Sequence, residues 1–141
     1  MAIQNYSPDN FVLAVNGREL TSWGEAALPY TDEPIDPKST LRRGQGGTGV
    51  RMNRTNPGRR VTIYLNPGSP DSAYMQGLFN SNANISLNMQ MIGTLEVATG
   101  TEGVIVNDGP VGRGGTTNAG VTDDMYVMEF NLWTALKGGD N

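Results

Sequence analysis

Residues 60–91 read RVTIYLNPGSPDSAYMQGLFNSNANISLNMQM, and this stretch decides the fold. Apolar and polar side chains alternate over residues 60–66 and again over residues 85–91. A period of two indicates a β-strand with one buried face. The sequence therefore predicts two strands separated by a segment of a different kind. The apolar faces of these strands hold Val61, Ile63, Leu65, Ile85, Leu87, Met89 and Met91.

The segment between the two strands, residues 69–80, is typical of an α-helix. Ser69 offers its hydroxyl as an N-cap, Pro70 needs no backbone partner in the first turn, and Asp71 suits the positive end of the helix dipole. Apolar side chains recur at helical spacing, and polar side chains occupy the opposite side. The apolar stripe consists of Tyr74, Met75, Leu78 and Phe79, and the polar side of Ser72, Gln76 and Asn80.

The composition excludes several classes of function. The 141 residues carry a formal net charge of −4 and include 19 glycines, 8 prolines, no cysteine and no histidine. The chain therefore lacks thiolate chemistry, the commonest general base and the commonest metal ligand. We expect one domain with long loops that is not an enzyme and has no cofactor, catalytic residue or metal site. No leader is recognisable in residues 1–10, and no apolar run is long enough to predict a membrane span.

Further strands are expected on both sides of this core. Asn16-Gly17 predicts a hairpin between residues 11–15 and 18–23, because this dipeptide favours a tight two-residue turn. The last strand is apolar on both faces, so its outer face, with Trp133, is expected to meet another subunit or a packed loop. The expected strands are residues 11–15, 18–23, 50–55, 60–66, 85–91, 95–99, 104–107 and 125–134, with turns at 56–58 and 100–103 and an extended arm at 1–9.

Two long loops are expected, residues 24–49 and the glycine-rich residues 108–124. Charge is segregated along the first of these loops and the strands that follow it. Four acids, Glu25, Asp32, Glu33 and Asp36, precede six bases, Arg42, Arg43, Arg51, Arg54, Arg59 and Arg60. The two groups can pair inside one monomer or head-to-tail between copies, and a head-to-tail contact builds rings or filaments.

Three other interpretations of these loops have less support from the sequence. Residues 44–49 read GQGGTG, but a phosphate-binding glycine loop lies between a strand and a helix, which is not the pattern here. The acids of residues 25–36 fit no calcium-binding loop. Residues 42–60 could bind nucleic acid through their arginines, but they include no aromatic side chain on which bases would stack.

In the order of its elements, the chain resembles the tail tube proteins of phages with contractile tails. The resemblance rests on an early hairpin, a long connecting loop, and a strand that ends in Asn66-Pro67-Gly68-Ser69-Pro70. A single capped helix, a following strand and an aromatic-rich last strand complete it, so that it covers roughly residues 8–136. It implies a mainly β fold, a β-barrel or split β-sandwich with one flanking helix. The type VI secretion tube protein shares that architecture.

The resemblance also implies a function. Such proteins form six-membered rings that stack into the inner tail tube of the virion, a conduit for DNA ejection that does not bind DNA specifically. The implied partners are other copies of the chain, the tail sheath, the baseplate and the tape-measure protein, with synthesis in the host cytoplasm. A baseplate or tube-end component, or a type VI secretion tube subunit, is the alternative, and a nucleic-acid-binding module using residues 42–60 is a weaker one.

Candidate assembly residues follow from the charges and from the resemblance together. We expect contacts between copies at Glu25, Asp32, Glu33, Asp36, Arg42, Arg43, Arg51, Arg54 and Trp133. The uncharged side chains of Ser86, Asn88 and Gln90 are expected to face the lumen, because an uncharged polar wall would let DNA slide past. A negative net charge repeated around a ring would also repel phosphates.

Overall fold

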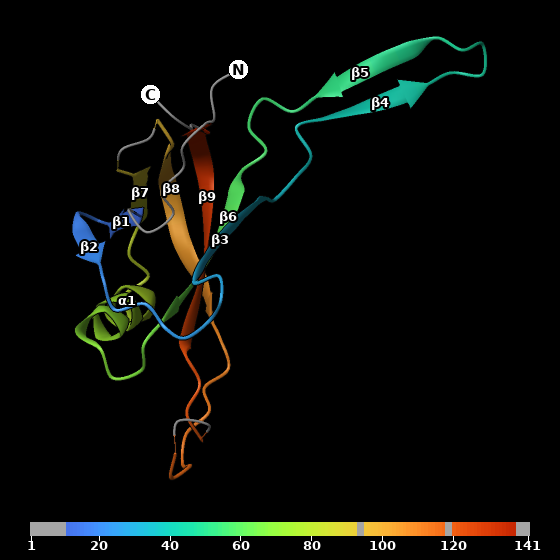
Figure 1. The fold of residues 1–141 in the computed structure, drawn as a ribbon. Helices are drawn as coiled ribbons and strands as arrows, with labels where there is room; N and C mark the ends of the chain where they lie inside the picture. Colours follow the sequence, from blue (N-terminus) through green and yellow to red (C-terminus); the bar gives the residue numbers. More distant parts are fainter. Residues whose placement is uncertain (1–10, 93–94, 118–119, 138–141) are drawn as a thin grey trace, which may run out of the picture.

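The computed structural model describes residues 11–92, 95–117 and 120–137. The arm expected at residues 1–9 lies outside them. The described chain is mainly β with a single helix, as the sequence predicts (Figure 1). Its elements are β1 (Phe11–Val15), β2 (Arg18–Leu20), β3 (Tyr30–Pro34), β4 (Ser39–Arg43), β5 (Gly49–Asn53), β6 (Arg59–Leu65), α1 (Pro70–Asn80), β7 (Ile85–Met91), β8 (Val97–Asp108) and β9 (Asp124–Leu136).

Seven strands form one antiparallel sheet in the order β2-β1-β7-β8-β9-β6-β3. The sheet curls, because the chain that leaves β2 reaches β6 on the far side through a bridge between Trp23 and Leu65. The Phe11 ring on β1 also lies 5.2 Å from the Tyr30 ring on β3, centroid to centroid. The result is a split barrel, open between β1 and β3.

The core fills the inside of this curled sheet. The alternating side chains of β6 and β7 point inward, as predicted, and are joined by those of β1, β8 and β9. Gly100 and Gly103 on β8 leave room for the Phe130 ring. A Cβ on Gly103 would lie only 2.3 Å from Cδ1 of Phe130, so the ring requires glycine there. The largest fully buried side chains include Phe130, Leu13, Ile63, Leu65, Met75, Leu87 and Met128.

Helix α1 begins as the sequence predicts and packs differently from the prediction. The Ser69 hydroxyl accepts a hydrogen bond from the Ser72 amide at 3.2 Å, and Met75 is fully buried. The other members of the apolar stripe are half-buried against the core. The prediction that Ser72 and Gln76 face away from the core is wrong. Ser72 is buried and both side chains contact β9, because hydroxyl and amide groups there find hydrogen-bonding partners.

The structure corrects three further expectations. Residues 24–49 are not an irregular loop, since they contain β3 and β4. Strand β5 pairs with β4 rather than turning back onto β6, and the glycines of residues 44–49 are the turn between them. The expected hairpin over residues 95–107 is a single strand, β8, because β9 pairs along its whole length. At residues 100–103, where the glycines predicted a turn, the strand instead has a bulge opposite β7, and Glu102 has a positive φ of 53°.

The two ends of the sheet carry different structures (Figure 1). At one end β1 and β8 begin and β7 and β9 end, and the β4–β5 hairpin leaves between β3 and β6. We call this the hairpin end. The opposite end carries α1, the Asn16-Gly17 turn and the loop of residues 109–123, and we call it the helix end. The two ends offer different surfaces to other molecules.

Candidate functional site

The β4–β5 hairpin is the most exposed structure of the described chain, and it stands away from the barrel (Figure 1). Val50 and Met52 are 53% and 52% exposed. The register pairs Arg42 with Val50 and Thr40 with Met52, so these four side chains share one face of the ribbon. Leu41 and Arg51 share the other. An isolated two-stranded ribbon with exposed apolar side chains is only marginally stable in water.

The hairpin is also strongly basic. Residues 39–53 contain three arginines, Arg42, Arg43 and Arg51, and no acid. No ion pair to these three is found among the described residues. Because the chain has a net charge of −4 and the hairpin contributes +3, the rest of the chain carries −7. The monomer is therefore bipolar, with a positive arm on a negative body.

The remaining arginines of the basic stretch pair with the acids that precede them. Arg59 binds Asp32, and Arg54 lies 3.7 Å from Asp36. These contacts form because β3 and β6 are neighbours, with Asp32 opposite Val61 and Glu33 opposite Arg60. Half of the segregated charge is thus neutralised inside the monomer, which was one of the two arrangements that the sequence left open.

Arg60 is the centre of a second set of ion pairs on the same strand. Its guanidinium lies 2.9 Å from Glu129 on β9 and 3.3 Å from Glu33 on β3. Hydrogen bonds that the guanidinium donates to the Glu129 and Glu33 carboxylates raise the pKa of Arg60. The three strands are therefore tied together on the outer side of the sheet. Glu25, the fourth predicted acid, donates its backbone N–H to Asp123 at 2.9 Å.

An open apolar pocket of about 650 Å³ lies in the split between β1 and β3. Its lining is mostly aromatic and aliphatic, and no residue of the β4–β5 hairpin contributes to it. Tyr30 lies on its wall and donates its hydroxyl to Asp32 at 2.7 Å. Burial and the nearby Asp32 carboxylate raise the pKa of Tyr30, so the phenol stays neutral. The apolar part of the lining includes Phe11, Trp23, Leu28, Met89, Met91 and Leu136.

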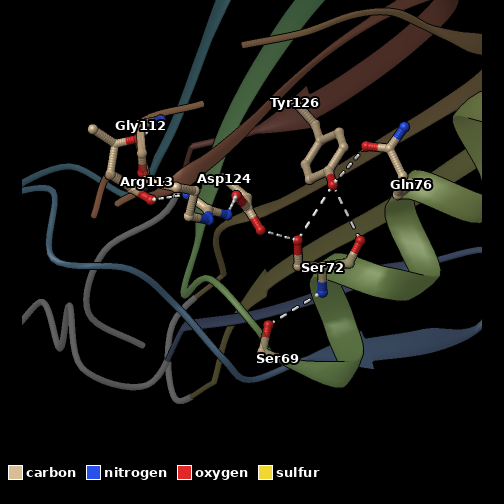
Figure 2. Close-up of polar contacts among 8 residues, drawn as sticks. Ser69, Ser72, Gln76, Gly112, Arg113, Asp124 and Tyr126 are labelled. Carbon is tan, nitrogen blue, oxygen red and sulfur yellow. Dashed lines mark hydrogen bonds and ion pairs between the residues drawn. The ribbon is translucent and has the colours of Figure 1, made fainter. Parts of the chain in front are cut away.

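A polar network at the helix end joins α1 to β9 and to the loop of residues 109–123 (Figure 2). Ser72 donates its hydroxyl to Asp124, and the Asp124 carboxylate also binds Arg113 at 2.7 Å. The Tyr126 hydroxyl lies 3.1 Å from the Ser72 carbonyl oxygen and 3.2 Å from Oε1 of Gln76. Burial raises the pKa of Tyr126. The network fixes the base of the loop to the helix.

A second polar anchor holds α1 to the chain after β2. Asp71 is 4% exposed, and its Oδ2 accepts the backbone N–H groups of Thr21 at 2.8 Å and Ser22 at 2.9 Å. Its Oδ1 accepts from Arg18 at 3.0 Å. Burial opposes ionisation of this carboxyl, but the N–H donors outweigh burial and lower the pKa of Asp71. The sequence alone indicates only that Asp71 lies in the first turn of the helix.

The predicted lumen residues lie on the outer face of β7. Ser86, Asn88 and Gln90 are all exposed. Asn88 accepts a hydrogen bond from Thr99 on β8 at 3.2 Å, so the polar surface continues onto the next strand. Trp133 is half-buried, with its ring 5.7 Å from that of Phe130. The lumen position of Ser86, Asn88 and Gln90 and the contact of Trp133 with another copy stay predictions.

Other kinds of site find no support in the described part of the chain. Within residues 11–92, 95–117 and 120–137 no three acidic side chains gather as a metal-binding group. The single described helix is too short and too polar to cross a membrane. The features that stand out in the described chain are the exposed hairpin, the apolar pocket and the polar network at the helix end.

Comparison with solved structures identifies the fold. The tube-terminating cap of the anti-feeding prophage superposes with a TM-score of 0.66 at 10% identity over 97% of this chain and 95% of that one. A chain of the PVC extracellular contractile injection system sheath-tube complex gives 0.63 at 10% identity over 93% and 90%. Hcp1 from Flavobacterium johnsoniae gives 0.53 at 14% identity over 93% and 98%. No model of a protein family and no curated protein sequence matches the chain.

These likenesses cover nearly the whole of both chains, so the split barrel with its single helix is a fold found in contractile injection systems. At these low identities the match concerns the fold alone. It agrees with the architecture expected from the sequence.

Proposed function

We propose that this chain is a structural subunit that assembles with copies of itself into the inner tube of a contractile tail. In this proposal six copies close into a ring and the rings stack, forming a conduit through which DNA leaves the virion. The tube would be surrounded by a sheath and joined to a baseplate and a tape-measure protein. The shared fold supports the proposal, because several proteins with that fold come from tubes and caps of contractile injection systems.

The observation that carries the proposal is the β4–β5 hairpin. It exposes apolar side chains and three arginines on a ribbon that stands off the barrel, while the rest of the chain is net negative. Such an arm and such a body are complementary but lie on different surfaces of one molecule. Contacts between unlike surfaces of identical chains are heterologous, and they produce rings when the rotation closes and filaments when it does not.

The outer face of β7 suits the wall of a conduit. Its exposed side chains, Ser86, Asn88 and Gln90, are polar and uncharged, and Thr99 extends this surface onto β8. A wall of this kind holds neither phosphates nor apolar cargo. We propose that this face lines the lumen and that the arginines of the hairpin lie at contacts between subunits, away from passing DNA.

Electron microscopy of the purified full chain, in negative stain, tests the proposal. Rings with a central hole, and tubes made of stacked rings, are the expected result. A chain that remains monomeric by light scattering at millimolar concentration would rule out the tube. Replacing Arg42 and Arg43 by glutamate should weaken assembly, because it reverses the charge of the arm. Glu19→Lys, at an exposed position on β2, is a control that also changes the charge by two units per site.

A tube-terminating subunit is the second candidate. Two of the similar structures, the anti-feeding prophage cap and the PVC sheath/tube terminator, with TM-scores of 0.66 and 0.62, support it. A terminator must close into a ring without continuing to polymerise. Single rings at all concentrations would favour this function, and long tubes would favour the first.

Nucleic-acid binding by residues 42–60 is a weaker candidate function. Three of the arginines in this stretch, Arg54, Arg59 and Arg60, pair with acids of the same chain. Fluorescence anisotropy with a labelled DNA duplex tests it directly. A nucleic-acid-binding module would bind at low salt and lose affinity steeply as salt rises. A tube subunit with a net negative charge should show no such binding.

A further inference from the structure

The pocket between β1 and β3 is suited to binding a group of apolar side chains. Its volume of about 650 Å³ is within the range of binding sites in general. Its lining includes core residues such as Met89 and Ala98 and the aromatic residues Phe11, Trp23 and Tyr30. An open apolar site of this size, in an otherwise well-filled barrel, leaves a substantial apolar surface in water.

One surface of the same chain fits it. Val50 and Met52 lie on one face of the β4–β5 hairpin and are more than half exposed. The hairpin points away from the barrel in Figure 1 and contributes nothing to the lining of its own pocket. In the monomer, the apolar face of the hairpin is thus exposed and the pocket is open to solvent.

We propose that the Val50–Met52 face of the hairpin inserts into the β1–β3 pocket of a second copy of the chain. The pocket lining carries two carboxylates, Asp32 and Glu96, and two cations, Arg59 and Lys137, so burial of apolar side chains provides the local fit. The longer-range attraction comes from the positive arm approaching a body of net charge −7. Arg42, on the same face as Val50, would lie at the rim.

The positions of the two surfaces specify the kind of contact. The pocket is lined by Phe11, Met91 and Leu136, which are strand termini at the hairpin end, and by Trp23 and Tyr30, which lie toward the helix end, where β6 ends and β3 begins. Arm and pocket are different surfaces of one chain, so a contact between them joins two copies heterologously. Copies that stand side by side, related by rotation about an axis along the strands, can bring them together.

In the proposed ring, the contact joins neighbouring copies. Each copy gives one arm and receives one, so the contact closes only when the ring is complete. This inference rests on the proposed assembly of the chain with itself, and it adds which surfaces meet and in which direction.

Disulfide trapping in the full-length chain tests the inference, since the chain has no cysteine of its own. Val50→Cys is combined with Ala135→Cys, which lies in the pocket lining. A disulfide needs Cα atoms within about 7 Å, so it reports close approach. After mild oxidation we expect a ladder of linked chains on a non-reducing gel that ends at the ring number and disappears with reductant.

The matched control is Arg51→Cys with Ala135→Cys. Arg51 is the next residue along β5 and lies on the opposite face of the ribbon, so its ladder should be at least tenfold weaker. Equal ladders from the two pairs, or a disulfide formed within one chain, would overturn the inference. As a second measurement, Val50→Asp should raise the protein concentration needed for assembly at least tenfold, and Leu41→Asp on the other face should raise it less.

The results separate this inference from the proposed function. Rings or tubes without the Val50–Ala135 ladder would overturn the pocket contact and leave the tube proposal standing. A ladder without rings or tubes would support the pocket contact and overturn the tube. A chain that gives neither ladder nor assembly would overturn both.

Discussion

Replacing Asp71 by asparagine should destabilise the subunit without changing its shape. The two side chains are isosteric, but asparagine carries no charge. Oδ2 of Asp71 accepts both backbone N–H groups, from Thr21 and Ser22, while Oδ1 accepts from Arg18. An asparagine whose oxygen takes the place of Oδ2 keeps both backbone bonds in neutral form. Its NH2 group then faces the Arg18 guanidinium, where two donors meet and no bond forms.

The magnitude follows from these three contacts. A hydrogen bond to a charged group contributes roughly 1 kcal/mol more than a neutral one, so two weakened backbone bonds lose about 2 kcal/mol. Loss of the Arg18 contact adds about 1 kcal/mol, with Arg18 itself partly exposed to water. We expect Asp71→Asn to lower the free energy of unfolding by about 3 kcal/mol. For a domain of this size that is a fall in Tm of about 10 °C.

Urea unfolding followed by tryptophan fluorescence measures the change. Self-association would add concentration-dependent stability, so the measurement is made at two protein concentrations tenfold apart. Glu19→Gln is the control, because it removes one carboxylate from an exposed position on β2. It should change the free energy of unfolding by less than about 0.5 kcal/mol.

The pH dependence provides an independent check. The pKa of Asp71 is lowered in the folded state, so the ionised carboxylate stabilises the fold above its unfolded pKa of about 3.9. That contribution is lost as the pH falls through the lowered folded value. The difference between parent and Asp71→Asn should therefore be full at pH 7 and shrink below about pH 4. A difference under about 0.5 kcal/mol at pH 7, or one that does not shrink in acid, would refute the reasoning.

Two smaller changes test the barrel and the helix by the same unfolding assay. Gly103→Ala should lower the free energy of unfolding by about 2–3 kcal/mol, since its Cβ would lie 2.3 Å from Phe130. In the Gly103→Ala variant, Phe130→Leu should lower it by less than the same substitution does in the parent. If the effects of Gly103→Ala and Phe130→Leu are additive, the Phe130 ring is not the reason that this position requires glycine. Ser69→Ala should cost about 1 kcal/mol through loss of the N-cap, whereas Ser69→Asp should retain most of the stability. Equal losses from both substitutions at Ser69 would show that the cap bond does not matter.

Much of the candidate assembly surface could be anticipated, and part of it could not. The segregation of acids and arginines is visible in the sequence, and three of the six arginines prove to pair with acids inside the monomer. Which three do so depends on β3 lying beside β6, a pairing that the three prolines of residues 24–49 obscured. The hairpin itself had a readable signal, since the glycines of residues 44–49 lie between two short segments with β-forming residues.

The pocket and the two polar anchors had no such signal. Asp71 is held by the backbone N–H groups of residues 49 and 50 positions away, and backbone groups are the same in every sequence. Ser72 and Asp124 are 52 positions apart and meet only because β9 passes the helix. Such contacts depend on the path of the chain rather than on local residue preferences.

The sequence by itself determined the core strands β1, β6, β7 and β9, the helix and its cap. These features depend on side-chain periodicity and on hydrogen bonds between residues a few positions apart, which a contiguous stretch encodes. The tertiary structure alone decided the strand order, the pairing of β4 with β5, and the pocket between β1 and β3. Strand partners are selected by which apolar faces can be buried together, and that is a property of the whole chain.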